Sequence, residues 1–231
     1  MSVEIITGNI FTSKCQTIVN TINCVGVMGA GIALECRLRY PEMFEKYVIH
    51  CKNGELAPGI LWLYKADDRW ILNFPTKADW KAPSKVGYLH AGLEKFVESY
   101  EKKGIESIAF PLLGADKGGI PKEESQAIIL QHLDLLNIRI ELYHYDPNAS
   151  DDLFADFQNW YVSGGDVILR EQHKISKNIL TKISEAFTSH EVKQLNQLGS
   201  IKGVGVKSLE KIFRVAQSDL APSKVQASLD F

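Results

Sequence analysis

The sequence predicts an α/β fold in which helices cover both faces of a mixed sheet of about six strands, followed by a small helical region. Short apolar runs typical of strands alternate with amphipathic helical segments over the first two thirds of the 231 residues. Two glycine-rich loops, 26–31 and 114–119, each follow such an apolar run. The length suits one main domain with an appendage. A net charge of −2 argues against a general polyanion binder.

The predicted strands and helices follow one another along the first 147 residues. Proline suits the first turn of a helix and breaks its interior, so Pro41 is expected to divide one long helical stretch into two. The polar turn at 67–68 predicts a hairpin between the strands beside it. The run 105–113 is almost wholly apolar, which is typical of a central strand buried on both faces. The predicted strands are 3–6, 17–22, 60–64, 70–74, 105–113 and 138–145, and the predicted helices are 32–50, 87–103 and 122–136.

The composition changes after the main domain, which we place at residues 1–147. Residues 148–175 are predicted to form an acidic helical linker, because aspartates dominate the first half of this stretch. Residues 176–217 are predicted to be helical and basic, with seven lysines and arginines against three glutamates. Residues 218–231 are predicted to form a flexible tail.

The first glycine loop has the layout of an anion site. A buried strand leads through Asn23 into this loop, and a predicted helix begins at Ile32. Glycines allow a close backbone approach, and the first N–H groups of a helix have no partner within it. A phosphate or diphosphate satisfies both features. An ordinary turn explains the loop equally well, although the second glycine loop favours the phosphate interpretation. The glycine spacing matches neither a P-loop nor a dinucleotide fingerprint.

Lys77 and Asp116 are the candidate catalytic residues. A lysine just after a strand is usually a solvated surface residue. Lys77, however, is expected at the same sheet edge as both glycine loops, where it could neutralise phosphate or attack a sugar C1 to form a Schiff base. Asp116 lies within the second loop and could orient the lysine or accept its proton, or simply cap its own turn. Asn9 and Asn23 are likewise either turn residues or groups that contact a nucleoside.

The four cysteines and six histidines predict no metal site. The cysteines all lie in the first quarter of the chain and have no CxxC spacing, which fits free thiols in a reducing cytoplasm. No apolar run approaches the ~20 residues that cross a bilayer, and no leader begins the sequence. We therefore expect a cytoplasmic protein with no membrane association.

Four motifs together resemble the macrodomain family. They are TGNI at 7–10, VNTINCVGVMGAGIAL at 19–34, NFPTK at 73–77 and PLLGADKGG at 111–119. The match covers roughly residues 1–147 and is most similar to the DarG-like antitoxins and the terminal ADP-ribose protein glycohydrolases. The resemblance implies a three-layer α/β/α fold that holds ADP-ribose and needs no cofactor.

The resemblance also implies roles for individual residues. Asn9 and Ile10 would contact the adenine, Asn23 the distal ribose, and Lys77 would be the catalytic lysine, with Asp116 a less secure partner. Many macrodomains have aspartate where Asn9 stands, and the DarG-like proteins usually have cysteine and glycine at positions 115 and 116. The residues implied to contact ADP-ribose are Asn9, Ile10, Asn23, Gly26, Val27, Met28, Gly29, Ala30, Gly31, Ile32, Thr76, Gly114, Ala115, Asp116, Lys117, Gly118 and Gly119.

A second resemblance concerns residues 198–212, which are similar to a helix-hairpin-helix motif. Apolar positions on either side of a glycine hairpin would pack two helices together. The hairpin would present backbone N–H groups to a DNA phosphate without reading sequence. A plain turn or a surface for a toxin partner is the alternative. The residues expected to contact DNA are Lys202, Gly203, Val204, Gly205 and Lys207.

Two functions follow from these resemblances. The first is an ADP-ribosyl glycohydrolase, centred on Lys77, that removes ADP-ribose from DNA or, as the other acceptor, from protein. The second is a non-catalytic ADP-ribose reader whose C-terminal arm binds DNA or a partner, because one fold serves both roles. Hydrolysis of ADP-ribose 1″-phosphate is a third and weaker alternative.

Overall fold

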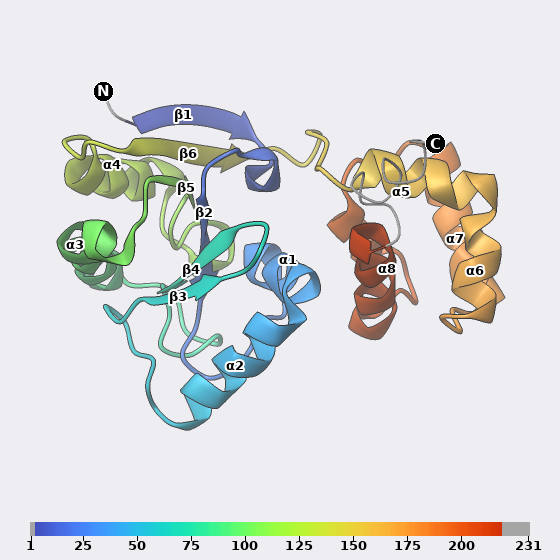
Figure 1. Cartoon of the computed structure of the whole chain (residues 1–231), viewed down its shortest axis with the longest axis horizontal. Coiled ribbons are helices and arrows are strands. Elements are labelled where there is room, and N and C mark those ends of the chain that lie inside the picture. Colours follow the sequence, from blue (N-terminus) through green and yellow to red (C-terminus); the bar gives the residue numbers. More distant parts are fainter. Residues whose placement is uncertain (1–2, 219–231) are drawn as a thin grey trace, which may run out of the picture. The chain divides into compact units, whose positions relative to one another are not determined.

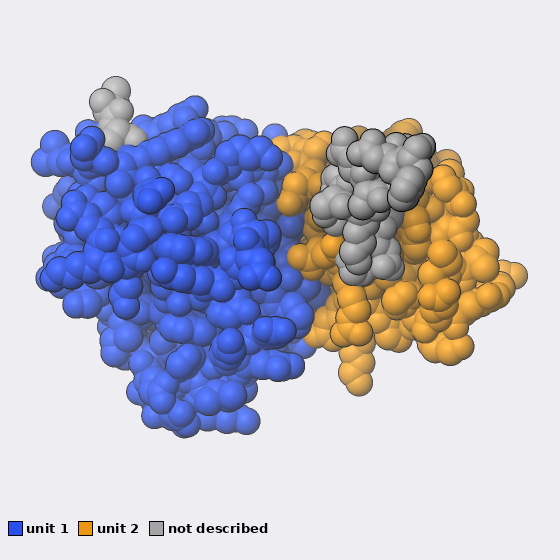
Figure 2. Space-filling view, viewed as in Figure 1, with its two compact units in different colours: residues 1–146 blue, residues 147–231 orange. Residues whose placement is uncertain are grey.

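The computed structural model of the chain describes residues 3–218. The chain divides into two compact units, Met1–Asp146 and Pro147–Phe231, which Figure 2 shows in different colours. The predicted flexible tail lies outside the described residues from position 219 onward. No helix in the described part of the chain is long and apolar enough to span a bilayer.

The first unit contains the predicted six-stranded mixed sheet (Figure 1). Its strand order is β1-β6-β5-β2-β4-β3. Only the β3–β4 pair is antiparallel, as the hairpin prediction requires, and every other neighbouring pair is parallel. The strand bounds are β1 Val3–Gly8, β2 Thr17–Ile22, β3 Trp62–Lys65, β4 Trp70–Pro75, β5 Ser107–Pro111 and β6 Arg139–Tyr145.

Two helix pairs cover opposite faces of this sheet and confirm the three-layer α/β/α fold. Helices α1 (Gly31–Arg39) and α2 (Pro41–Lys52) bury Cys36, Met43 and Tyr47 against one face. Helices α3 (Val86–Lys103) and α4 (Lys122–Leu133) bury side chains such as Leu93, Phe96 and Ile129 against the other. Pro41 begins α2, as predicted. Helix α4 ends three residues before its predicted end, and Leu135 beyond it is 96% exposed.

The strand order brings three loops to one edge of the sheet. Strands β4, β2 and β5 are consecutive parallel neighbours, so their carboxyl ends point the same way. The first glycine loop follows β2, the second follows β5, and the loop that holds Lys77 follows β4. Ligands of such sheets bind at the carboxyl ends of the strands. The fold therefore places all three predicted site segments at one edge.

The second unit consists of helices joined by turns in the part that the structure describes. Aromatic side chains form part of its core, where Phe157 and Tyr161 each pack edge-on against Phe187. The segment expected to be a linker therefore shares a core with the basic helices instead of connecting two bodies. The unit comprises α5 (Phe154–Trp160), a π turn (Tyr161–Gly165), α6 (Asp166–Glu171), α7 (Lys177–Thr188), a 3₁₀ turn (Leu195–Ser200) and α8 (Val206–Ser218).

A histidine pair joins α3 to α4 and predicts a pH dependence of stability. The Nδ1 atom of His90 lies 2.8 Å from Nε2 of His132. Burial and the neighbouring His90 lower the pKa of His132, against an opposing effect of Glu94. The folded state therefore binds fewer protons than the unfolded chain, and this site loses stability as the pH falls below the ordinary histidine value of about 6.5. Denaturant unfolding at pH 7.5 and pH 5.5 should show a larger decrease for wild type than for His132→Gln.

Candidate functional site

Hydrogen bonds join the loop after β4 to the two glycine loops. The backbone N–H of Cys24 donates to the carbonyl of Ala78 at 3.1 Å. This bond connects the loop after β4 to the start of the first glycine loop. The N–H of Ser84 donates to the carbonyl of Gly118 at 2.9 Å, and this bond connects the loop after β4 to the second glycine loop. The three loops predicted to meet at this edge therefore do meet.

Lys77 reaches from one of these loops to another. Its Nζ donates to the backbone carbonyl of Lys117 at 2.7 Å. Its own carbonyl accepts a hydrogen bond from the Cys24 thiol at 3.4 Å. The amine thus lies at the rim of the second glycine loop, and the backbone of the same residue contacts the first. This position suits a residue that acts on a ligand lying between the two loops.

Asn23 organises the first glycine loop from within. Its Oδ1 accepts the N–H groups of Val25 and Val27, at 3.0 and 3.3 Å, and its Nδ2 donates to the Val27 carbonyl. The hydroxyl of Tyr47, buried in α2, donates to the carbonyl and Oδ1 of Asn23 at 2.9 and 3.0 Å. Asn23 therefore shapes the loop with most of its hydrogen-bonding capacity. Its predicted contact with a ribose is not tested by these bonds.

Tyr47 is a residue that the sequence analysis missed. Burial raises the pKa of Tyr47 far above its ordinary value, so the hydroxyl stays a donor. Removing it with Tyr47→Phe should deprive the Asn23 carbonyl and Oδ1 of this donor, destabilise the unit by roughly 1–3 kcal/mol and weaken ADP-ribose binding several-fold. Calorimetric titration with ADP-ribose measures this. Tyr64→Phe on the edge strand β3 is the control, and equal affinities in the two variants would contradict the role of Tyr47.

Helix α1 begins directly after the first glycine loop and has free donors at its start. Ala30 at its N-cap provides no side-chain bond, and the first turn holds no acidic residue. Gly29 and Gly31 are exposed beside it, and Gly31 has a left-handed φ of +57°. Unpaired N–H groups together with the helix dipole suit a phosphate. Met28, in contrast, is 1% exposed and packs in the core, so only its backbone can face a ligand.

The second glycine loop is a tight turn around a 3₁₀ segment, Asp116–Gly118. Gly114, Asp116 and Gly119 all have left-handed φ angles of +65°, +44° and +84°. The Asp116 carboxylate lies 4.0 Å from Nζ of Lys122, and its side chain is 66% exposed. The hydrogen bond of the Lys77 amine goes to a backbone carbonyl and not to this carboxylate. The structure therefore offers no contact through which Asp116 would orient Lys77.

Asn9 caps the short 3₁₀ segment Ile10–Thr12 that follows β1. Its Oδ1 accepts the N–H of Phe11 at 2.9 Å, and its side chain is buried. Ile10 is also buried. Both residues lie after β1, which the sheet places next to β6 and away from β4. Their predicted contact with adenine stays a prediction.

The thiol of Cys24 and the possible metal ligands of the described residues differ from what catalysis would require. Burial, with Cys51 nearby, raises the pKa of Cys24 to about 11. The thiol is therefore protonated at neutral pH and a poor nucleophile. Among residues 3–218 there is no group of three or more histidine, cysteine, aspartate or glutamate side chains that could hold a metal ion.

The glycine hairpin of the second unit is well formed. Gly203 has a φ of +101°, and the Lys182 amine donates to the Lys202 carbonyl at 2.8 Å. The N–H of Val204 already donates to the Ile201 carbonyl, and its side chain is buried. Val204 therefore closes the turn instead of offering a free donor, contrary to the expectation for this residue. The segment before the hairpin is a 3₁₀ turn and not the α-helix that a helix-hairpin-helix would have.

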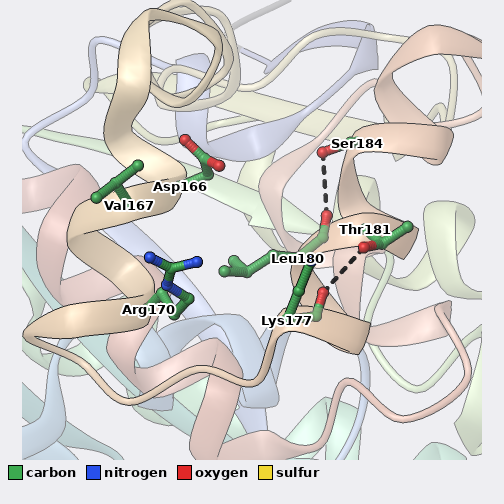
Figure 3. A pocket seen from close by; sticks show the side chains of 7 residues that line it. All are labelled: Asp166, Val167, Arg170, Lys177, Leu180, Thr181 and Ser184. Atoms are coloured by element: carbon green, nitrogen blue, oxygen red, sulfur yellow. Dashed lines mark hydrogen bonds between the residues drawn. The ribbon is translucent and has the colours of Figure 1, made fainter.

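A small pocket in the second unit lies between α6 and α7 (Figure 3). Its volume is about 130 Å³, below the roughly 300 Å³ at which ligand pockets begin. The hydroxyls of Thr181 and Ser184 on its wall donate to backbone carbonyls of their own helix, at 3.0 and 3.1 Å. Arg170 pairs with Glu171. This pocket is therefore too small and too internally bonded to be a nucleotide site.

The comparisons with known proteins agree with the geometry of the first unit. The Macro domain family model matches residues 19–129. The solved macrodomain of Mycobacterium tuberculosis DarG is 37% identical to this chain, which covers 96% of it, and the TM-score is 0.59 over 61% of this chain. The chain belongs to the macrodomain family. The resemblance seen in the motifs is thereby confirmed, with both glycine loops and Lys77 inside the matched region.

Two further comparisons place this macrodomain among larger proteins. A curated Mycobacterium tuberculosis protein named DNA ADP-ribosyl glycohydrolase is 33% identical over 168 residues, which are 71% of this chain and 47% of that protein. A solved structure of Thermosipho africanus DarTG in complex with ADP-ribose is 32% identical, with a TM-score of 0.58, over 62% of this chain and 42% of that one. The macrodomain chain spans less than half the length of these two proteins.

Proposed function

We propose that this macrodomain is an ADP-ribosyl glycohydrolase that removes ADP-ribose from DNA, with Lys77 as its catalytic residue. The observation that carries the proposal is the Lys77 amine, 2.7 Å from the Lys117 carbonyl, at the point where the three loops join. The names of the relatives support the activity and favour DNA as the acceptor. Binding of ADP-ribose through Asn9, the α1 N-terminus and the second glycine loop is part of this proposal.

The chemistry that this position supports is a covalent two-step hydrolysis. The neutral Lys77 amine attacks C1″ of the distal ribose, and the bond between C1″ and the acceptor breaks. The acceptor leaves with the bonding electrons and takes one proton of the amine. The C1″–O4″ bond of the ring then breaks, O4″ takes the second amine proton, and a Schiff base between C1″ and Lys77 remains. Water then adds to C1″, the C–N bond to Lys77 breaks, and free ADP-ribose and free lysine result. The net change is the addition of one water molecule.

The proposal is tested with three substrates in parallel. Wild-type protein is incubated with ADP-ribosylated single-stranded DNA, with ADP-ribosylated protein and with ADP-ribose 1″-phosphate, and the released product is measured. We expect ADP-ribose to be released fastest from DNA. Faster release from protein would move the proposal to that acceptor, and turnover of the phosphate alone would contradict it.

The non-catalytic reader remains the second candidate function. The observation that favours it is that the described hydrogen-bond partner of the Lys77 amine is a carbonyl and not a base that could take its proton. A reader would bind ADP-ribose and release none from any of the three substrates.

The four cysteines are free thiols, which supports the proposed location in a reducing cytoplasm.

We propose that the glycine hairpin of the second unit adds a sequence-independent contact to DNA phosphates. Lys202 and Lys207 are exposed on either side of it. Replacing both with alanine should weaken binding of the full chain to DNA and lower the steepness of its salt dependence by about two charges. Anisotropy titrations of a labelled oligonucleotide between low and moderate salt measure this.

The matched control removes two lysines elsewhere in the same unit, Lys174→Ala with Lys177→Ala. An equal loss in both double variants would indicate a general charge effect and contradict a hairpin site. No DNA binding by the wild type at low salt would favour the alternative occupant, a toxin or other protein partner.

A further inference from the structure

Trp80 is an exposed aromatic residue beside the proposed catalytic lysine. It lies in the segment between β4 and α3, three residues after Lys77, and its side chain is 51% exposed. Three residues of chain reach at most about 11 Å. The backbone of Trp80 therefore lies within that distance of the backbone of Lys77. A tryptophan combines a large apolar face with a polar N–H group, which suits it to contact a ligand at a surface.

The loop that carries Trp80 is held in place on both sides. The Ala78 carbonyl accepts the N–H of Cys24, and the Ser84 N–H donates to the Gly118 carbonyl. Between these anchors, Asp79 closes the turn around Trp80. Its carboxylate accepts the N–H of Lys81 at 2.9 Å, and its carbonyl accepts the N–H of Ala82 at 3.1 Å. The indole is thus presented outward by a fixed turn, which reduces the entropy lost when a ligand binds.

The charge around the indole is positive, in a chain whose net charge is −2. Residues 77–85 contain three lysines and one aspartate. The Asp79 carboxylate is occupied by the turn, and the Lys81 amine lies 5.5 Å from the centre of the Trp80 ring. Lys85 and Lys117 are also exposed. An aromatic face flanked by cations matches the pattern of single-stranded nucleic-acid sites, where bases stack and lysines bind phosphates.

We propose that Trp80 is a stacking platform for a nucleobase next to the modified one, with Lys81 binding the adjoining backbone phosphate. This inference rests on the proposed function, because it names single-stranded nucleic acid as the acceptor at the Lys77 site. Trp80 binds the acceptor strand and takes no part in bond cleavage. It sets the preference for a modified base within a strand over the same modified nucleoside alone.

The test compares two substrates that differ only in flanking nucleotides. One is an ADP-ribosylated single-stranded oligonucleotide, and the other is the same ADP-ribosylated nucleoside without neighbours. Trp80→Ala should raise KM for the oligonucleotide roughly ten-fold, with kcat unchanged, since stacking of one base is worth ~1–3 kcal/mol. It should leave KM for the nucleoside unchanged. Trp80→Phe should recover most of the loss.

The control is Leu135→Ala. This variant removes an apolar side chain that is 96% exposed and lies in the segment between α4 and β6. An unchanged KM for the oligonucleotide, or an equal loss on both substrates, would overturn the role of Trp80. If wild type acts on neither substrate, the proposed function fails. Anisotropy with unmodified oligothymidine then decides the inference by itself: weaker binding by Trp80→Ala supports it, and equal binding overturns it.

Discussion

Lys77→Ala is expected to lower the rate of ADP-ribose release about a thousand-fold, while the affinity for ADP-ribose changes only a few-fold. Loss of a positioned catalytic group typically costs ~10²–10⁴ in rate. Binding should survive, because the α1 N-terminus and the second glycine loop offer their donors through the backbone. Single-turnover release from ADP-ribosylated DNA and calorimetric binding of ADP-ribose measure the two quantities on the same samples.

The control for this prediction is Lys95→Ala on the outer face of α3, where the lysine pairs with Glu98 at an exposed position. It should match wild type in both assays. Release by Lys77→Ala within ten-fold of wild type would contradict a catalytic role. An equal fall in rate and in affinity would instead mean that Lys77 mainly neutralises phosphate.

Gly92→Ala is expected to lower the free energy of unfolding of the first unit by about 3 kcal/mol. A Cβ at this position of α3 would lie 2.1 Å from Cζ and 2.5 Å from Cε1 of Phe74. Phe74 on β4 is fully buried, so neither the ring nor the helix can move without displacing other core side chains. Denaturant unfolding followed by circular dichroism measures the change.

Gly87→Ala in the same helix is the matched control. A Cβ there meets no atom within 4 Å. Alanine also has the higher helix propensity, so stability should be unchanged or rise by up to about 1 kcal/mol. If both variants had the same free energy of unfolding, the close approach of Phe74 would not restrict position 92, which would contradict this prediction.

Local patterns predicted the elements of the first unit well. The strand at 17–22 and the break at Pro41 were placed correctly because a short apolar run and a proline act within a few residues. The central strand was recognised from its continuous apolar run, and β5 lies between β6 and β2. The meeting of the three loops was predicted from strand order, and the hydrogen bonds of Cys24 and Ser84 confirm it.

Contacts between residues distant in sequence could not be predicted from such patterns. Tyr47 lies 24 residues from Asn23, and nothing in the helical periodicity of α2 indicates that its hydroxyl shapes the glycine loop. The acidic stretch after residue 147 was interpreted by its charge, whereas Phe157 packs on Phe187 thirty residues away. In both cases tertiary packing decides what a side chain does.

The central claim is that the Lys77 amine bonds to the ribose C1″ during the reaction, and reductive trapping tests it most directly. Wild-type protein is mixed with ADP-ribosylated DNA in the presence of borohydride, which reduces a Schiff base to a stable amine, and the adduct is mapped by peptide mass spectrometry. We expect one ADP-ribose adduct on the peptide that contains Lys77, and none in Lys77→Ala. Turnover with no adduct, or an adduct on Lys117 instead, would contradict the claim.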